Sequence, residues 1–348
     1  MIADPSFCMS SWLMYRTIVD QNRSFSPKIS PWFFQNEPER KAVNTAAELE
    51  DALSARISQA LEQGRVGLML SGGMDSAILA AMMPKGTKAY TLRCHAKDAL
   101  DEVPTAAAYA ARNGLCHEIV DVYWSDYEEL ALPLMKQKGY PIHSIEVQIC
   151  KAARQAAADG VEVLIFGETA DIIYGGHSKL LSRDYTLEEF VQRFAFVDPR
   201  FVLKEPQWIT EPAETFVRKN GTVDVFAFLN SFEYPVSLGF YTNACRMGGI
   251  EFFAPYSYTV LGHPLDLDMI RRGESKYVIR RLYQKMYPDL PVPDKTPLPR
   301  PMAQWLKDWA GPEHPAFLPG CHEGLSGDQK WYVYALNEFM LKVMGRDL

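Results

Sequence analysis

The stretch Val66-Gly-Leu-Met-Leu-Ser-Gly-Gly-Met-Asp-Ser76 constrains the fold more than any other part of the sequence. Its first half, 66–70, is short and apolar, which is typical of a strand buried on both faces of a parallel sheet. The apolar segment 77–83 that follows predicts a helix. Two glycines, two serines and Asp75 stand between them. A parallel α/β fold explains this order, because polar turns lie at the carboxyl ends of its strands.

Strand-like and helix-like segments continue to alternate after this turn. Because a helix follows each strand, we expect a parallel sheet with helices on both faces. After about Gly176 the pattern changes to longer, aromatic-rich helical stretches interrupted by prolines. The expected strands are 66–70, 88–92, 117–122 and 161–166, and the expected helices between the later strands are 101–113, 127–138 and 145–158.

These patterns divide the chain into three parts. We expect an N-terminal extension at 1–41 and an α/β core at 42–180. The remainder, 181–348, is expected to be mainly helical and to complete the site. The segment 291–301 carries five prolines, which remove amide donors and fix the backbone, so it is expected to be a shaped loop.

Composition excludes several classes of protein. The formal net charge of -7 comes with scattered Lys and Arg, so a nucleic-acid partner is not expected. No run approaches the roughly 18 apolar residues of a membrane span, and the N-terminus lacks the pattern of a signal peptide. The six cysteines lack zinc-site spacing and are expected to be reduced and mostly buried. We therefore expect a soluble, cytoplasmic protein with no membrane partner, and a homodimer is compatible with the sequence.

The turn at 71–76 has the chemistry of a phosphate site. Gly72 and Gly73 let the backbone turn tightly and approach a ligand. Ser71, Ser76 and the amides that begin the next helix supply donors for phosphate oxygens. Asp75 would repel a phosphate unless a cation lay between them. Magnesium would resolve that conflict, because it binds one or two carboxylates together with phosphate oxygens.

A second polar segment, Phe166-Gly-Glu-Thr-Ala-Asp-Ile-Ile-Tyr-Gly-Gly-His177, follows the last expected strand of the core. In a parallel sheet it would place Glu168 and Asp171 on the same rim as Asp75. Two of the carboxylates could then share magnesium, and the third would remain available as a base.

The two segments together resemble a known family. Ser-Gly-Gly-Met-Asp-Ser at 71–76 resembles the SGGxDS PP-motif of the N-type ATP pyrophosphatases, which have an adenine nucleotide α-hydrolase-like, Rossmann-like fold. The segment 166–177 resembles the SGEGSDELFGGY signature of asparagine synthetases, with Ile172 in place of a Glu and His177 in place of the final Tyr. The chain thus resembles the synthetase domain of the asparagine synthetase and β-lactam synthetase family.

The resemblance implies a role for each matched position. Asp75 and Asp171 would bind Mg²⁺. Glu168 would take a proton from the attacking amine, and Lys295 would stabilise charge that builds on the acyl and phosphate oxygens. The residues implied to hold ATP are Ser71, Gly72, Gly73, Asp75, Ser76, Leu92, Gly167 and Lys276.

The resemblance also implies a reaction. A carbon-nitrogen ligase of this kind adenylates a small carboxylic acid with ATP, releases pyrophosphate, and joins nitrogen to the acyl group as AMP leaves. Glutamine-using relatives begin with a glutaminase domain whose nucleophilic cysteine follows the initiator methionine. This sequence begins Met1-Ile2, so we expect its nitrogen to come from ammonia or from a separate glutaminase.

Two alternatives remain open. The β-lactam synthetases resemble the same fold turned to intramolecular amide closure of an amino-carboxylate. They place Tyr where Glu168 stands and tolerate an aliphatic residue at the position of Ile172, so the two positions point in opposite directions. A non-catalytic nucleotide-binding homologue is a weaker alternative, because the charged residues of the site are all retained: Asp75, Glu168, Asp171, Lys276 and Lys295.

Overall fold

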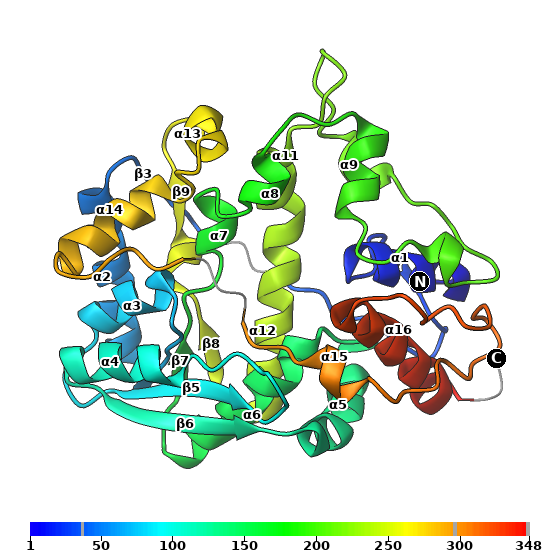
Figure 1. Ribbon diagram of the computed structural model, residues 1–348, viewed down its shortest axis with the longest axis horizontal. Helices are drawn as coiled ribbons and strands as arrows, with labels where there is room; N and C mark the ends of the chain where they lie inside the picture. Colours follow the sequence, from blue (N-terminus) through cyan, green and yellow to red (C-terminus); the bar gives the residue numbers. More distant parts are fainter. Residues whose placement is uncertain (36–37, 295–297, 346–348) are drawn as a thin grey trace.

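A five-stranded parallel sheet forms the centre of the computed structural model, which describes residues 1–35, 38–294 and 298–345 (Figure 1). Its strand order is β6-β5-β4-β7-β8, and every neighbouring pair is parallel. The predicted α/β class is confirmed. The strands are β4 (Val66–Met69), β5 (Lys88–Cys94), β6 (Cys116–Val122), β7 (Val163–Ile165) and β8 (Glu251–Phe253).

The direction of winding reverses at β4. From β4 the chain adds β5 and then β6 on one side, whereas β7 pairs with the other side of β4. Ligands of open α/β sheets bind at such a switch point, outside the carboxyl ends of the strands. Leu68 pairs with Ile165, so β4 and β7 end nearly level and the segments that follow them leave the sheet side by side.

Helices cover both faces of the sheet (Figure 1). The expected helices at 101–113, 127–138 and 145–158 are confirmed with small shifts of their ends. One group packs around α3 and the other around α6. The first group is α2 (Ala46–Gln63), α3 (Met74–Met82), α4 (Val103–Asn113) and α14 (Tyr277–Met286), and the second is α5 (Trp124–Lys138), α6 (Ser144–Ala158) and α12 (Tyr234–Gly248).

The remaining elements are shorter and lie mostly outside the sheet. Two further parallel pairs join β1 (Ile2–Ala3) to β2 (Arg23–Ser24) and β3 (Lys41–Val43) to β9 (Thr259–Leu261). The other helices are α1 (Pro5–Tyr15), α7 (Ala170–Ile173), α8 (Ser178–Leu181), α9 (Leu187–Phe194), α10 (Glu211–Glu214), α11 (Val225–Phe228), α13 (Leu267–Arg271), α15 (Met302–Trp305) and α16 (Gly327–Phe339), with 3-10 turns η1 (Pro199–Phe201) and η3 (Pro255–Tyr258) and π turns η2 (Leu229–Glu233) and η4 (Met340–Met344).

Residues far apart in the sequence build the same layers. Strand β8, from the later part of the chain, completes one edge of the sheet beside β7. At the N-terminus, α1 packs on α16, where the Trp12 indole Nε1 donates to the carbonyl of Tyr332 at 3.1 Å. The described cysteines are free thiols, and four of the six are buried, as expected. None of the helices in the described ranges has the length and apolarity to cross a membrane.

A fully buried ion pair joins α5 to α6 beneath α12. The Lys138 ammonium lies 2.6 Å from Glu146 Oε1, and both side chains have no exposed surface. Asn243 Nδ2 donates to the other carboxylate oxygen at 2.7 Å, and the amide of His143 donates to Oε1 at 2.8 Å. Burial raises the pKa of Glu146 and lowers the pKa of Lys138, while each partner opposes the shift of the other.

Breaking this buried pair should destabilise the protein strongly. Lys138→Met should lower the free energy of unfolding at neutral pH by about 3–5 kcal/mol, because Glu146 would be left buried without its cation. The loss should shrink as the pH falls, because a carboxyl with a raised folded-state pKa favours the folded state once it is protonated. Chemical denaturation at several pH values measures both effects.

The matched control is Arg154→Met, which removes an exposed ion pair between the same two helices. Arg154 lies 2.9 Å from Glu129, and these side chains are 44% and 68% exposed. Its loss should change the free energy of unfolding by less than about 1 kcal/mol. Equal effects of the two substitutions would contradict the importance given to burial.

Candidate functional site

The turn after β4 is held by its own serine side chains. The amide of Ser71 donates to Ser76 Oγ at 3.1 Å, and the two hydroxyl oxygens lie 3.0 Å apart. The Gly73 amide donates to Ser71 Oγ at 3.2 Å. Helix α3 begins at Met74, three residues earlier than the apolar pattern predicts, so Asp75 lies in its first turn. The turn therefore presents a helix N-terminus and a carboxylate at the rim of the sheet.

The segment after β7 has two glycines at close contacts, one with this turn and one within the segment itself. A Cβ on Gly167 would lie 3.1 Å from the Cβ of Asp75 and 3.1 Å from the amide nitrogen of Ser76. A Cβ on Gly176 would lie 2.0 Å from Asp171 Oδ1. Thr169 adopts φ of 70° where the chain enters α7, which carries Asp171. Glycine at 167 allows the segment to approach the turn, and glycine at 176 allows the segment to lie close to Asp171.

The ammonium of Lys276 joins the two rim carboxylates. It forms ion pairs with Asp75 Oδ2 and with Asp171 Oδ1, the latter at 3.0 Å. The Lys276 side chain is 4% exposed, whereas those of Asp75 and Asp171 are 23% and 34% exposed. Burial lowers the pKa of Lys276, but the two carboxylates outweigh that effect and leave its pKa raised. The carboxylates of adjacent strand ends thus face one common point.

Lys276 itself is held in an uncommon backbone conformation. Its φ of 56° and ψ of 38° lie in the left-handed region, immediately before α14 begins at Tyr277. Non-glycine residues adopt this region uncommonly, and the conformation costs of order 1 kcal/mol or more. The sequence predicts that Lys276 meets phosphate oxygens. In the structure its ammonium contacts the carboxylates, and its predicted role toward phosphate stays a prediction.

The two carboxylates are a donor set that suits magnesium. Mg²⁺ commonly takes one or two protein carboxylates and completes its shell with phosphate oxygens and water. Asp75 and Asp171 fit that description because both reach one cationic group. Within the described ranges no cluster of three or more His, Cys, Asp or Glu could hold a metal by protein ligands alone.

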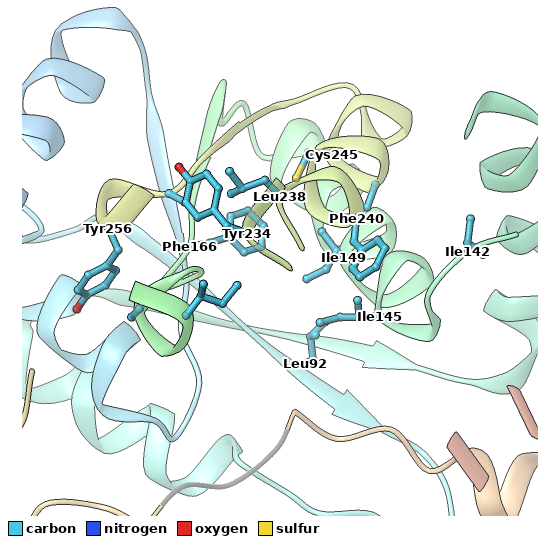
Figure 2. Packing of buried hydrophobic residues seen from close by; sticks show 14 of the residues in the cluster. Leu92, Ile142, Ile145, Ile149, Phe166, Tyr234, Leu238, Phe240, Cys245 and Tyr256 are labelled. Carbon is cyan, nitrogen blue, oxygen red and sulfur yellow. The ribbon is translucent and has the colours of Figure 1, made fainter. Parts of the chain in front are cut away.

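A cavity of about 230 Å³ opens beside these groups. One side is apolar: Leu92 on β5 lies near Ile145 and Ile149 on α6, with Phe166 next to them (Figure 2). The opposite side is polar and includes most of the positions that the sequence predicts. The predicted residues that line the cavity are Ser71, Gly73, Asp75, Ser76, Leu92, Gly167, Glu168 and Asp171.

Glu168 faces the cavity and is oriented by α12. Ser237 Oγ donates to Glu168 Oε1 at 2.7 Å. Tyr241, one turn further along α12, also lines the cavity. Burial raises the pKa of the Tyr241 hydroxyl well above its usual value, and the Glu168 charge adds to the rise. A carboxylate fixed in this way is placed to accept a proton inside the cavity.

Several lining residues carry no signal in the sequence. Ile145 and Ile149 belong to the apolar face of α6 and cannot be told from core residues by their spacing. Ser237 and Tyr241 reach the site only through the packing of α12. The hydroxyl of Tyr256, from η3, donates to the carbonyl of Asp75 at 3.1 Å and fixes the start of α3 from a distant part of the chain.

Glu102 is a further carboxylate that the sequence does not single out for this site. It lines the cavity, is 7% exposed and lies behind the glycine turn. Burial raises its pKa, and an interaction with the Gly72 amide opposes that rise. A Cβ on Gly72 would lie 3.5 Å from Glu102 Oε1. Glu102 therefore supports the turn through Gly72.

Two predicted residues differ from the rest in placement. Gly72 and Lys276 lie behind the lining residues, in contact with Glu102 and with the rim carboxylates respectively. Lys295 lies outside the described residues, so its predicted role toward the acyl and phosphate oxygens stays a prediction. Leu298, where the described chain resumes, lines the cavity.

Comparisons with known proteins give a match to a family and matches to solved structures. The profile of the family described as asparagine synthase matches residues 45–224, more than half of the chain. The comparison with curated proteins gives no match. Among solved structures, the chain is similar to the U34-tRNA thiolase NcsA from Methanococcus maripaludis with its 4Fe-4S cluster, at 12% identity and a TM-score of 0.30, over 74% of this chain and 90% of that one. At that TM-score the likeness supports no conclusion about this site.

Removing the shared ammonium should expose the repulsion between the carboxylates. Breaking a buried ion pair typically costs about 3–5 kcal/mol. Lys276→Met should lower the free energy of unfolding by an amount near the lower end of that range, because water still reaches both acids. Millimolar MgCl₂ should then restore more stability to Lys276→Met than it adds to the wild type. Thermal and chemical unfolding with and without the salt measure this difference.

Two variants serve as controls for that experiment. Lys285→Met removes a more exposed ion pair between α14 and Glu50 of α2, and it should have an effect below about 1 kcal/mol. Asp75→Asn combined with Asp171→Asn in the Lys276→Met background should abolish the response to MgCl₂. An equal magnesium response in all variants would show that the two carboxylates do not face a common point.

Proposed function

Because the chain belongs to the asparagine synthase family, we propose that it is an ATP-dependent ligase that forms an amide from a carboxylic acid and ammonia. Family membership indicates an enzyme that uses ATP. The more specific proposal, adenylation with release of AMP and pyrophosphate, is supported above all by the shared position of Asp75 and Asp171 at the ends of β4 and β7.

The nucleotide is proposed to lie across the cavity at the switch point. Its polyphosphate would meet the amides of the turn 71–76 and the N-terminus of α3, where backbone donors and the helix dipole favour negative charge. Leu92, Ile145 and Ile149 offer an apolar surface for the adenine. Magnesium bound by Asp75 and Asp171 would supply neutralisation of the polyphosphate charge. Lys276, once released from the carboxylates, would meet phosphate oxygens.

The first step is proposed to be acyl adenylation. A carboxylate oxygen of the acid attacks the α-phosphorus of ATP and forms an oxygen-phosphorus bond. The bond between the α-phosphorus and the bridging oxygen to the β-phosphate breaks, and pyrophosphate leaves with the electron pair. Such transfers depend mainly on positioning and electrostatic stabilisation. The turn 71–76 and the lysines supply both.

The second step is proposed to be attack by ammonia on the acyl carbon. A carbon-nitrogen bond forms, the carbon-oxygen bond to AMP breaks, and one proton leaves the nitrogen. Glu168 is placed to accept that proton, since it faces the cavity and Ser237 holds one of its oxygens. An amine already on the substrate could replace ammonia, which would make the enzyme a cyclase.

Product analysis tests the proposed cleavage directly. Incubation with ATP, Mg²⁺ and a panel of carboxylic acids should release AMP and pyrophosphate in equal amounts, and amide should accumulate only when ammonium is present. Formation of ADP and orthophosphate would rule out cleavage at the α-phosphorus. Turnover of an amino-carboxylate to a cyclic amide without ammonium would replace the preferred reaction by the cyclising one.

Substitution of the three acids should separate the two steps. Asp75→Asn and Asp171→Asn should each reduce pyrophosphate exchange by at least about 100-fold, because charge stabilisation would be lost. Glu168→Gln should retain exchange within about tenfold yet reduce amide formation by about 10²- to 10⁴-fold, the usual contribution of a general base.

Exposed residues of the same types provide the matched controls. Asp51→Asn and Glu62→Gln, both on α2, should leave both activities unchanged, since these side chains lie on the exposed side of that helix. Ser237→Ala should lower amide formation less than Glu168→Gln does and shift its pH profile, as expected for a positioning residue. Equal loss of both steps in all three acid variants would refute this division of roles.

A further inference from the structure

A second, larger cavity adjoins the proposed site and has no role in the steps above. It has a volume of about 880 Å³. Helices from separate parts of the chain line it: the end of α1, α8, the second half of α9, η2 and the start of α16. Most of its lining lies within the 45–224 segment that matches the family profile, and the rest comes from before and after that segment.

The segment after α7 separates the two cavities. Gly176 lines the larger cavity, and its amide donates to the carbonyl of Asp171 at 2.7 Å, while Asp171 lines the smaller one. Glu233, on the floor of the larger cavity, is close enough to Glu168 for that charge to raise its pKa, in addition to the larger effect of burial. A molecule in the larger cavity would therefore end beside the proposed reaction centre.

The floor of the larger cavity is electrically balanced. Arg16 Nη2 donates to both carboxylate oxygens of Glu233, at 2.9 and 2.8 Å. The Arg16 guanidinium also lies over the rings of Phe194 and Phe196, 5.5 and 5.8 Å from their centroids. Each acid that lines the cavity has an arginine partner, since Asp328 lies 3.5 Å from Arg300.

The outer part of the cavity carries uncompensated positive charge. Lys179 on α8 and Arg193 on α9 both line it and are exposed. Within the described part of the chain, neither forms an ion pair with an acid at 4.0 Å or less. Two such cations in one cavity are notable in a chain whose net charge is -7. They offer a binding site for an anionic group away from the reaction centre.

We infer that this cavity binds the acyl substrate, and that the substrate is a carboxylic acid longer than a free amino acid with a second anionic group at its far end. Pockets of about 300–1,000 Å³ hold drug-sized ligands, so a volume near the upper limit exceeds what a small acid needs. The reacting carboxylate would lie toward Gly176, and the second anion would lie between Lys179 and Arg193. This inference names the substrate class for the proposed ligase and rests on that proposal.

Matched pairs of probes test the second anionic group. D-Glucuronic acid 1-phosphate is compared with D-glucuronic acid, and suberic acid with octanoic acid, by isothermal titration calorimetry with and without Mg²⁺ and α,β-methylene-ATP. At least one probe with two anionic groups should bind at least about tenfold more tightly than its partner, as expected for a charge-assisted contact. The pair that shows the preference distinguishes phosphate from carboxylate.

The double variant Lys179→Ser/Arg193→Ser should abolish that preference, because it removes both outer cations. The control Lys204→Ser/Arg272→Ser removes the same charges from exposed positions outside the cavity and should retain it. The inference is overturned if neither probe pair shows a preference, if the preference survives in Lys179→Ser/Arg193→Ser, or if both double variants lose it equally.

Pyrophosphate release, measured in parallel samples that contain ATP in place of α,β-methylene-ATP, separates this inference from the proposed function. A wild-type protein that prefers the probes with two anionic groups in calorimetry but releases no pyrophosphate with any acid retains the cavity assignment and refutes the ligase. A protein that releases pyrophosphate with equal KM in the wild type and Lys179→Ser/Arg193→Ser retains the ligase and refutes the cavity assignment.

Discussion

The contact of one ammonium with two carboxylates organises the site of this protein. Lys276 brings α14 to the ends of β4 and β7, and its charge allows Asp75 and Asp171 to lie close together. Without a cation between them, two carboxylates in a partly buried position would repel each other. The fold thus contains a point of high negative potential that is already occupied by a positive group.

The rest of the architecture keeps that point in place. The register of β4 and β7 ends the two strands nearly level, and Gly167 allows their loops to approach each other. Tyr256 fixes the first turn of α3 from the C-terminal half of the chain. These constraints come from separate elements, so the geometry of the two acids is set before any ligand arrives. Preorganisation of this kind is what electrostatic catalysis requires.

The strand-turn-helix at the centre of the site could be predicted from the sequence, because local patterns determine it. The convergence of Asp75 and Asp171 could be predicted as well, since parallel strands place their carboxyl ends on one edge. The contribution of α12 could not, because Ser237 reaches Glu168, and Tyr241 reaches the cavity, only through long-range packing. The start of α3 at Met74 also lay outside the apolar pattern, because the helix begins within the polar turn. The larger cavity could not be predicted at all, since helices from both ends of the chain enclose it.

The most direct test of the central claim is a crystal structure with Mg²⁺ and α,β-methylene-ATP, which cannot be cleaved between its α and β phosphates. The account predicts one magnesium ion that is bound by Asp75 and Asp171, either through their carboxylate oxygens or through a water. Phosphate oxygens should complete its ligands at about 2.1 Å. It also predicts that the Lys276 ammonium leaves the carboxylates and contacts a phosphate. A nucleotide bound elsewhere would contradict the account. So would a nucleotide that has the two acids on separate sides of it while the Lys276 ammonium still contacts them.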